Sequence, residues 1–248
     1  MRLMILFFFV FFTALAKAET TLVAVASNFT KPMTEIAAEF EKSTGHSAKL
    51  SFGSSGKFVS QIENGAPFDV FLSADDKSPA NLQQGGFAVE KTDFTYALGK
   101  LVLWSATANY VDDKGDILNQ GGFQHLSLAD PKLAPYGAAA VDVLKNQNVL
   151  DKLQPLVVVG ENISQAYQFI STGNAELGFI ALSQVSENGK ISSGSAWIVP
   201  QTLYAPIKQN AVLLKTGENN PAAKALLDYL KTAPAKAIIQ KYGYDLPH

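Results

Sequence analysis

Hydrophobic residues along this chain follow two alternating patterns: uninterrupted apolar runs, and runs with the spacing of a helix face. Residues 21–26 form an apolar, partly β-branched run, as expected for a strand that is buried on both faces. Met33, Ile36 and Phe40 then repeat at helical spacing in a segment that ends near Gly45. The strand and helix patterns continue to alternate, and this order predicts a parallel sheet with helices on both faces.

The alternation extends to residue 181 and builds two units. The first unit continues with strands expected at 48–52 and 69–73 and a helix at 57–63. The second has strands expected at 101–105, 125–128, 156–159 and 177–181 and helices at 138–144 and 164–171. The tail, residues 221–242, is also helical in pattern, and Pro234 predicts that it divides into two helices.

The two units are expected to be lobes between which the chain crosses more than once. No Pro/Ser-rich linker separates them, which argues against two independent domains joined once. Candidate crossings lie at residues 96–103 and 204–213. We therefore expect an α/β fold in which residues 19–98 and 208–248 form one lobe and residues 99–207 the other, each a mainly parallel sheet flanked by helices.

Residues 1–18 have the form of a cleavable signal peptide. Arg2 gives a positive start, an apolar stretch follows to Leu15, and Ala16-Lys17-Ala18 has the small-x-small form of a cleavage site. The apolar stretch is shorter than the ~20 residues that a membrane-spanning helix needs. The mature protein is therefore expected to be exported to the periplasm.

Composition narrows the class of protein further. The chain has 248 residues, of which 47% are hydrophobic and 17% charged, and it contains no cysteine. Disorder, a disulfide framework and a cysteine nucleophile are thereby excluded. The formal charge of −2 lacks the basic excess of a nucleic-acid binder. These features are typical of a soluble globular protein that handles a small molecule.

Candidate chemistry gathers at the turns that follow the predicted strands. In an open α/β sheet, ligands collect at the carboxyl ends of strands, where helices begin. Four such turns stand out, at residues 26–30, 52–56, 129–137 and 160–164. Their serine hydroxyls and free helix-start N–H groups are neutral donors, and several of them converging on a cleft form an anion site without Lys or Arg. Each turn taken alone is equally consistent with a helix cap.

Sharper enzyme motifs are not satisfied. Gly56-Lys57 lacks the upstream glycine and following Ser/Thr of a P-loop, and residues 53–56 do not form a nucleophile elbow. His46 and His125 fall in or beside loops and are expected at the surface. Asp75 and Asp76 are expected to face solvent or cap a helix. The sequence therefore predicts that the protein is not an enzyme.

Several motifs resemble those of the periplasmic molybdate-binding proteins of ABC-type uptake systems, which have the bilobal type II periplasmic binding-protein fold. The likeness covers essentially the whole mature chain, and the segment at 62–75 is its most specific part. The motifs are VASNF at 25–29, FGSSG at 52–56, IENGAPFDVFLSAD at 62–75, ADP at 129–131, PYG at 135–137, AELGF at 175–179 and KYGY at 241–244.

The resemblance implies a tetrahedral oxyanion held in the cleft between the lobes by neutral hydrogen-bond donors. The family's contact positions fall on Ser27, Asn28, Ser55 and Tyr136 and on the backbone N–H of Ile163. They contact the oxygens of molybdate and are not direct metal ligands. Some members of the family also donate from a tyrosine where this chain has Ala181, and we infer that Tyr136 supplies that hydroxyl from the opposite wall.

The resemblance also implies the biological role. The protein would bind molybdate, and tungstate with it, as a monomer without a cofactor, and pass the ion to a membrane permease. Another tetrahedral oxyanion such as sulfate or thiosulfate is the alternative ligand. An exported serine hydrolase and a sensor or scaffold that has lost its ligand are the alternative classes.

Overall fold

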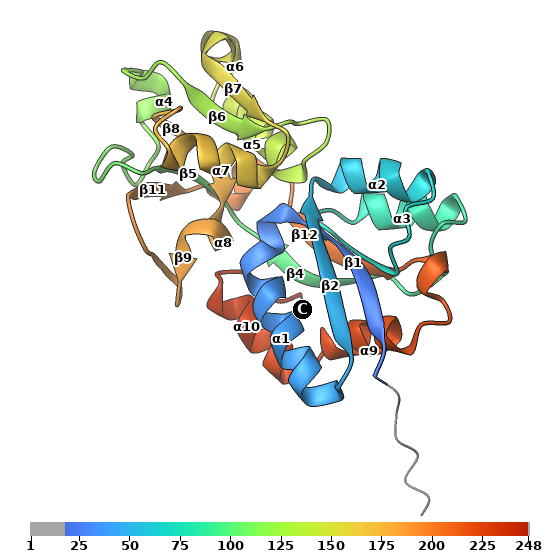
Figure 1. Cartoon of the computed structure of the whole chain (residues 1–248). Coiled ribbons are helices and arrows are strands. Elements are labelled where there is room, and N and C mark those ends of the chain that lie inside the picture. The colour runs from blue at the N-terminus through green and yellow to red at the C-terminus, as the bar shows by residue number, and fades with distance from the viewer. Residues whose placement is uncertain (1–17, 248) are drawn as a thin grey trace, which may run out of the picture.

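Two five-stranded sheets form the centres of two lobes, and the structure, a computed structural model, describes residues 18–247 (Figure 1). The first sheet has the order β2-β1-β3-β12-β4. Strands β1, β2 and β3 are parallel, whereas β12 runs antiparallel to both of its neighbours, so the sheet is mixed. Its strands are β1 (Thr20–Ala26), β2 (Ser47–Gly53), β3 (Val70–Ser73), β4 (Phe94–Gly99) and β12 (Ile207–Leu213).

The second sheet has the order β11-β5-β8-β6-β7 and is mixed for the same reason. β6 is parallel to β7 and β8, while β5 is antiparallel to β8 and β11. Its strands are β5 (Leu101–Ser105), β6 (Leu126–Ala129), β7 (Val157–Gly160), β8 (Leu177–Ala181) and β11 (Ser195–Ile198). A separate hairpin pairs β9 (Ser186–Glu187) with β10 (Lys190–Ile191).

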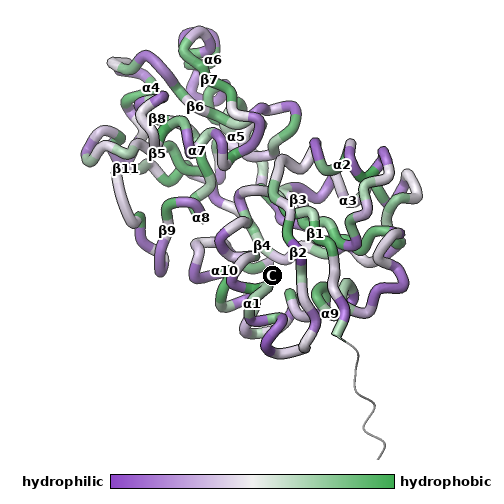
Figure 2. Tube along the Cα trace, viewed as in Figure 1, coloured by the Kyte–Doolittle hydropathy of each residue, from purple (hydrophilic) through white to green (hydrophobic). Residues whose placement is uncertain are grey.

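Helices cover both faces of each sheet because the strands alternate their side chains between the faces. Val23 packs toward α1 and α9, whereas Ala24 packs toward α2 and α3. In the second sheet, Leu103 and Trp104 likewise belong to separate hydrophobic clusters. Figure 2 shows hydrophobic residues concentrated along the strands. The α-helices are α1 (Thr30–Thr44), α2 (Ser55–Glu63), α3 (Lys77–Gln84), α4 (Ile117–Gln120), α5 (Pro135–Asn146), α6 (Leu150–Leu153), α7 (Ile163–Ser171), α8 (Leu182–Val185), α9 (Pro221–Tyr229) and α10 (Ala233–Lys241).

The chain passes between the two sheets at two neighbouring places. It leaves the first sheet after Gly99 and enters the second at Leu101, so Lys100 alone joins β4 to β5. It returns through residues 199–206, between β11 and β12. The Tyr204 hydroxyl accepts a hydrogen bond from the N–H of Leu101 at 3.1 Å and thereby ties the two crossings together.

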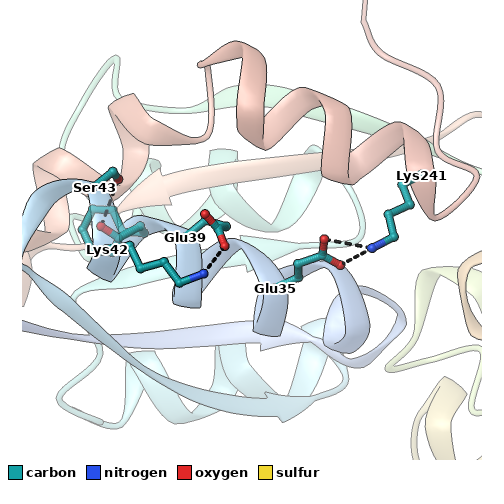
Figure 3. A network of polar contacts seen from close by, with 6 residues as sticks. Glu35, Glu39, Lys42, Ser43 and Lys241 are labelled. Atoms are coloured by element: carbon teal, nitrogen blue, oxygen red, sulfur yellow. Dashed lines mark hydrogen bonds and ion pairs between the residues drawn. The ribbon is translucent and has the colours of Figure 1, made fainter.

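Helix α10 fastens the C-terminal segment to helix α1. Lys241 Nζ lies 2.9 Å from both carboxylate oxygens of Glu35, as Figure 3 shows. The Tyr242 hydroxyl donates to the same carboxylate at 2.8 Å. The Lys241 ammonium lowers the pKa of Glu35 below its ordinary value. The residues that follow α10 are thus held against the first lobe, close to the crossings.

Asp69, in the segment at 62–75, connects separate parts of the first lobe through hydrogen bonds. Its carboxylate accepts hydrogen bonds from the N–H of Leu22 in β1, at 2.8 Å, and from Asn220 Nδ2, at 3.0 Å. Asn220 also caps α9 by accepting from the N–H of Ala222. One carboxylate therefore links the first strand to the start of the C-terminal helices.

The predicted two-lobed α/β fold is confirmed, with differences in detail. The first five predicted elements, three strands and two helices, appear in the predicted order as β1, α1, β2, α2 and β3. The tail divides into α9 and α10, with Pro234 in the first turn of α10. The sheets are mixed because β12 is antiparallel to β3 and β4, and because β5 is antiparallel to β8 and β11. The pattern gave no element of their own to β4, β11 and β12. The expected signal peptide lies outside the described residues but for Ala18. Among residues 18–247, no helix combines the length and apolar character needed to cross a membrane.

Candidate functional site

Four helix starts converge on one small cavity between the lobes. Each follows a strand: η1 (Ser27–Phe29) follows β1, α2 follows β2, α5 follows β6 after a short loop, and α7 follows β7. The cavity is small, with only about 10 Å³ open to the centre of a water-sized sphere, far less than the ~300–1,000 Å³ typical of sites for drug-sized ligands. Its lining consists of Ala26, Ser27, Asn28, Gly53, Ser54, Ser55, Ala74, Ala134, Pro135, Tyr136 and Ile163.

All five residues expected from the sequence lie in this lining, and each is at most 5% exposed. They come from both lobes. Ser27, Asn28 and Ser55 belong to the first lobe, whereas Tyr136 and Ile163 belong to the second. A wider interlobe groove shares Ala74, Ala134 and Pro135 with the cavity.

Asn28 contributes to the cavity mainly through its backbone. Its side-chain amide donates one hydrogen bond to Gln209 Oε1, at 2.7 Å, and one to the Tyr244 hydroxyl, at 2.9 Å. An amide nitrogen carries only two hydrogens, so both are engaged away from the cavity. The N–H of Asn28 lies in the first turn of η1, where N–H groups have no partner within the helix.

The second turn offers two serine hydroxyls. Ser55 Oγ accepts a hydrogen bond from the N–H of Ala74 at 3.0 Å, which leaves its own proton free to donate. Ser54 occupies the cap position of α2, yet its side chain makes no capping bond. Its buried hydroxyl has no hydrogen-bond partner among the described residues. Ser54 is therefore a candidate contact that the sequence did not single out, because a serine before a helix resembles an ordinary cap.

The fourth turn presents a single backbone donor. Asn162 caps α7 by accepting from the N–H groups of Ser164, at 2.9 Å, and Gln165, at 3.1 Å. That cap does not engage the N–H of Ile163, the first residue of the helix. The Ser27 hydroxyl also donates to Asn162 Oδ1, at 3.3 Å, and joins the two lobes beside the cavity.

Tyr136 places a buried hydroxyl deep between the lobes. The hydroxyl makes no hydrogen bond of regular geometry within the described part of the chain, and the Tyr244 hydroxyl lies near it. It lies against the backbone of Gly99 at the first crossing. Burial raises the pKa of Tyr136 well above its ordinary value, so the hydroxyl stays protonated and remains a donor. Ala181, by contrast, does not line the cavity, and its N–H is engaged by Gln184 Oε1 at 2.9 Å.

No acidic or basic side chain lines the cavity, and Tyr136 is the only titratable group in its lining. The available groups are hydroxyls and the N–H groups of helix starts, which together favour negative charge. A fully deprotonated anion can accept from every one of them. A protonated anion also needs an acceptor for its own hydrogen and would leave that hydrogen unpaired.

The residues that would support hydrolysis lie elsewhere. His46 Nδ1 accepts from the N–H of Glu19, and His125 lies beside Glu176 at the surface. Asp75 accepts from the N–H of Ser78 at 2.6 Å and so caps the start of α3. None of these three residues lines the cavity. Within residues 18–247, no group of three or more His, Asp or Glu is placed to hold a metal ion.

The fold and cavity are those of a solute-binding protein, and the comparisons with known proteins agree. Residues 21–245 match the model of the bacterial extracellular solute-binding proteins, and the chain belongs to this family. It is 56% identical over 231 residues to a molybdate-binding protein of Azotobacter vinelandii, covering 93% of this chain and 92% of that one. A molybdate-binding protein of Rhodobacter capsulatus is also 56% identical, over 92% of this chain and 89% of its own length.

A solved structure extends the likeness to three dimensions. The periplasmic molybdate-binding protein of Azotobacter vinelandii superposes with a TM-score of 0.89 at 42% identity, covering 92% of this chain and all of that one. These relatives are named as binding proteins. The chain is accordingly a binding protein and not an enzyme, as the sequence predicts.

Proposed function

We propose that this protein binds molybdate, and tungstate in the same way, in the cavity between its lobes. The observation that carries the proposal is the convergence of neutral donors from four helix starts on one cavity without an ionisable acid or base. The relatives named as molybdate-binding proteins support the choice of ion. The contacts are Ser55 and Tyr136 through hydroxyls, Asn28 and Ile163 through backbone N–H groups, and Ser27 through its hydroxyl, which turns from its long 3.3 Å bond with Asn162 to the ion.

Selection among anions follows from charge and size. Hydrogen phosphate carries a proton for which an all-donor cavity has no acceptor. Sulfate is a dianion but is smaller than molybdate, so a cavity shaped for the larger ion gives it longer and weaker hydrogen bonds. Molybdate and tungstate are nearly equal in size and charge and are bound alike.

The protein acts in the periplasm as the monomeric solute-binding component of an ABC importer. Residues 1–18 direct export and are removed. The lobes, residues 19–98 with 208–248 and residues 99–207, close on the ion about the two crossings. Closure excludes water and strengthens the hydrogen bonds. The closed form then docks on a membrane permease, which carries the ion inward as cargo; no cofactor takes part.

Thermal unfolding of the mature protein tests the choice of ion. The protein is melted with molybdate, tungstate, sulfate or phosphate at millimolar concentration. A ligand present at ~1,000 times its dissociation constant adds about 4 kcal/mol to the free energy of unfolding. We expect large shifts with molybdate and tungstate and small ones with the other two. An equal shift with sulfate would overturn the selectivity, and no shift with any of them would overturn the ligand class.

A further inference from the structure

A closed ring of three hydrogen bonds lies behind the cavity and begins and ends on Asn28. The Asn28 side-chain amide donates to the Tyr244 hydroxyl at 2.9 Å. That hydroxyl lies within donating distance of Ser183 Oγ, at 3.0 Å. Ser183 Oγ in turn donates to the Asn28 backbone oxygen at 2.7 Å. The Tyr244 hydroxyl also lies 2.9 Å from the Asn28 backbone oxygen, so that oxygen has two hydroxyl donors within reach, Tyr244 and Ser183.

The ring joins parts of the chain that are far apart in sequence and lie in different lobes. Asn28 follows the first strand, Ser183 lies in α8 of the second lobe, and Tyr244 belongs to the C-terminal segment after α10. All three are buried. The hydrogen bond from Ser183 to Asn28 therefore exists only when the second lobe lies against the first.

Tyr244 is held firmly on both sides. Before it, Lys241 and Tyr242 are bonded to Glu35 of α1. After it, Asp245 pairs with Leu98 through two backbone hydrogen bonds, of 2.8 and 3.1 Å, at the end of β4. Its ring also packs edge-on against Phe29, with the ring centroids 5.3 Å apart. The hydroxyl is thus a fixed point of the first lobe.

Asn28 is secured by a fourth bond outside the ring. Its second amide hydrogen goes to Gln209, which is fully buried and lies at the irregularity of β12 between Gln209 and Asn210. With its side-chain amide and its backbone carbonyl engaged, Asn28 is fixed in the place where it lines the cavity. Such preorganisation lowers the entropic cost of binding.

We propose that Tyr244 and Ser183 are positioning residues which fix Asn28 for the ligand and make its position depend on lobe closure. The inference rests on the proposed oxyanion function. It adds a relay, by which we mean the ring of Asn28, Ser183 and Tyr244, and the last two of these residues lie outside the cavity lining. Loss of the Tyr244 hydroxyl leaves one amide hydrogen of Asn28 unpaired, and loss of the Ser183 hydroxyl removes the shorter of the two bonds to the Asn28 backbone oxygen. Either change loosens the hold on Asn28. Binding then weakens although no group in the cavity has been changed.

The test measures molybdate binding by titration calorimetry with the full mature chain. Tyr244→Phe and Ser183→Ala each remove one hydroxyl of the ring, and we expect either change to raise Kd about tenfold. The matched controls are Tyr96→Phe and Ser186→Ala. Both remove a buried hydroxyl that has no hydrogen-bond partner among the described residues, and Tyr96 packs on the same Phe29 ring. We expect Kd to be unchanged in the controls.

A second measurement separates positioning from general support of the fold. Small-angle scattering follows the radius of gyration with and without molybdate, and thermal unfolding without ligand gives the stability of each variant. A merely structural role would lower the melting temperature but leave Kd of the folded protein unchanged at 25 °C. We expect Kd to rise and the ligand-induced compaction to diminish in Ser183→Ala, which also serves if Tyr244→Phe does not fold.

The outcomes distinguish this proposal from the one on which it rests. Wild-type protein that gives no heat with molybdate overturns the proposed function and the relay together. Wild-type protein that binds, with ring variants that bind equally well, overturns the relay alone.

Discussion

The Tyr136 hydroxyl occupies the place where a side chain on Gly99 would begin. A Cβ atom added at Gly99 would lie 2.1 Å from the Tyr136 hydroxyl oxygen and 3.0 Å from its Cζ. Gly99 has no positive φ, so the backbone does not require glycine there. Glycine is required because any side chain at this position would fill the space that Tyr136 occupies. Gly99, at the first crossing, thereby sets the position of a hydroxyl in the second lobe.

Gly99→Ala is therefore expected to weaken both folding and binding. The added methyl group displaces the Tyr136 ring or the crossing, and overpacking of this kind costs about 1–3 kcal/mol in the free energy of unfolding. Urea unfolding measures this loss, and calorimetry with molybdate measures the accompanying rise in Kd. The double variant Gly99→Ala/Tyr136→Phe should recover part of the stability but not the affinity. A stable Gly99→Ala protein with unchanged affinity would contradict the proposed role of Tyr136.

The two serines of the second turn are expected to contribute to ligand affinity, whereas a serine further along α2 is not. Ser54→Ala and Ser55→Ala each remove a cavity hydroxyl and should cost about 1–2 kcal/mol of binding free energy, or roughly five- to thirtyfold in Kd. Ser55→Ala also deprives the N–H of Ala74 of its acceptor and should lower the melting temperature slightly. Ser60→Ala, on the exposed side of the same helix, is the control and should change neither quantity. Unchanged affinity in Ser54→Ala would remove that residue from the site.

Affinity for molybdate should be independent of pH from about pH 6 to pH 9. Tyr136 is the only titratable group in the lining, and burial raises its pKa well above the ordinary value, so it remains neutral throughout this range. Burial likewise raises the pKa of Tyr244 to about 12, and the ring behind the cavity also stays protonated. Calorimetry at several pH values checks this. A change in Kd that follows the uptake of one proton within the range would show that an ionisable group faces the ion.

The ion pair between Glu35 and Lys241 should contribute stability that is lost in acid. Its hydrogen bond to Lys241 lowers the pKa of Glu35 in the folded state. The folded state therefore binds this proton less readily than the unfolded state, and the contribution is present above the ordinary Glu pKa and disappears as the pH falls through the lowered value. The pair is partly exposed, so we expect Glu35→Gln to cost only about 0.2–1 kcal/mol at neutral pH.

Urea unfolding at neutral pH and near pH 3 measures the effect of Glu35→Gln. The difference between variant and wild type should shrink at the lower pH. Glu39→Gln is the control, because Glu39 pairs with Lys42 on the same helix but is more exposed (Figure 3). A difference that persists unchanged in acid would show that Glu35 acts through packing instead of charge.

The elements that the sequence predicted best are the strands buried on both faces. The strands at Leu101–Ser105 and Leu177–Ala181 have the bounds that their uninterrupted apolar runs predict. β12 was recognised only as part of a crossing because it carries Gln209 and Asn210, which look like loop residues. Both are buried in the structure, where they bond to Asn28 and Thr95. The polar side chains of β12 are paired with residues elsewhere in the chain, so an apolar run does not mark this strand in the sequence.

The residues of the candidate site could be predicted only in part. The turns after buried strands could be located from the pattern, and the family resemblance indicated positions within them. The unused capping hydroxyl of Ser54 and the direction of the Tyr136 hydroxyl could not be predicted. The Ser54 hydroxyl makes no bond to the first turn of α2, which follows it directly, and the Tyr136 hydroxyl lies against Gly99, which is distant in sequence.

The place of β12 in the first sheet also imposes an order of assembly on the chain. β12 lies between β3 and β4, but the whole second sheet, from Leu101 to Ile198, is synthesised before it. The second lobe is one continuous stretch and can fold from its own contacts as soon as β11 has emerged. The first lobe has to hold open the edges of β3 and β4 until residues 207–213 arrive, and exposed edges of this kind favour aggregation. Closing so long a loop makes the first lobe the slower to form. Substitutions in β12 should therefore reduce the yield of exported protein before they alter the ligand affinity of the molecules that do fold.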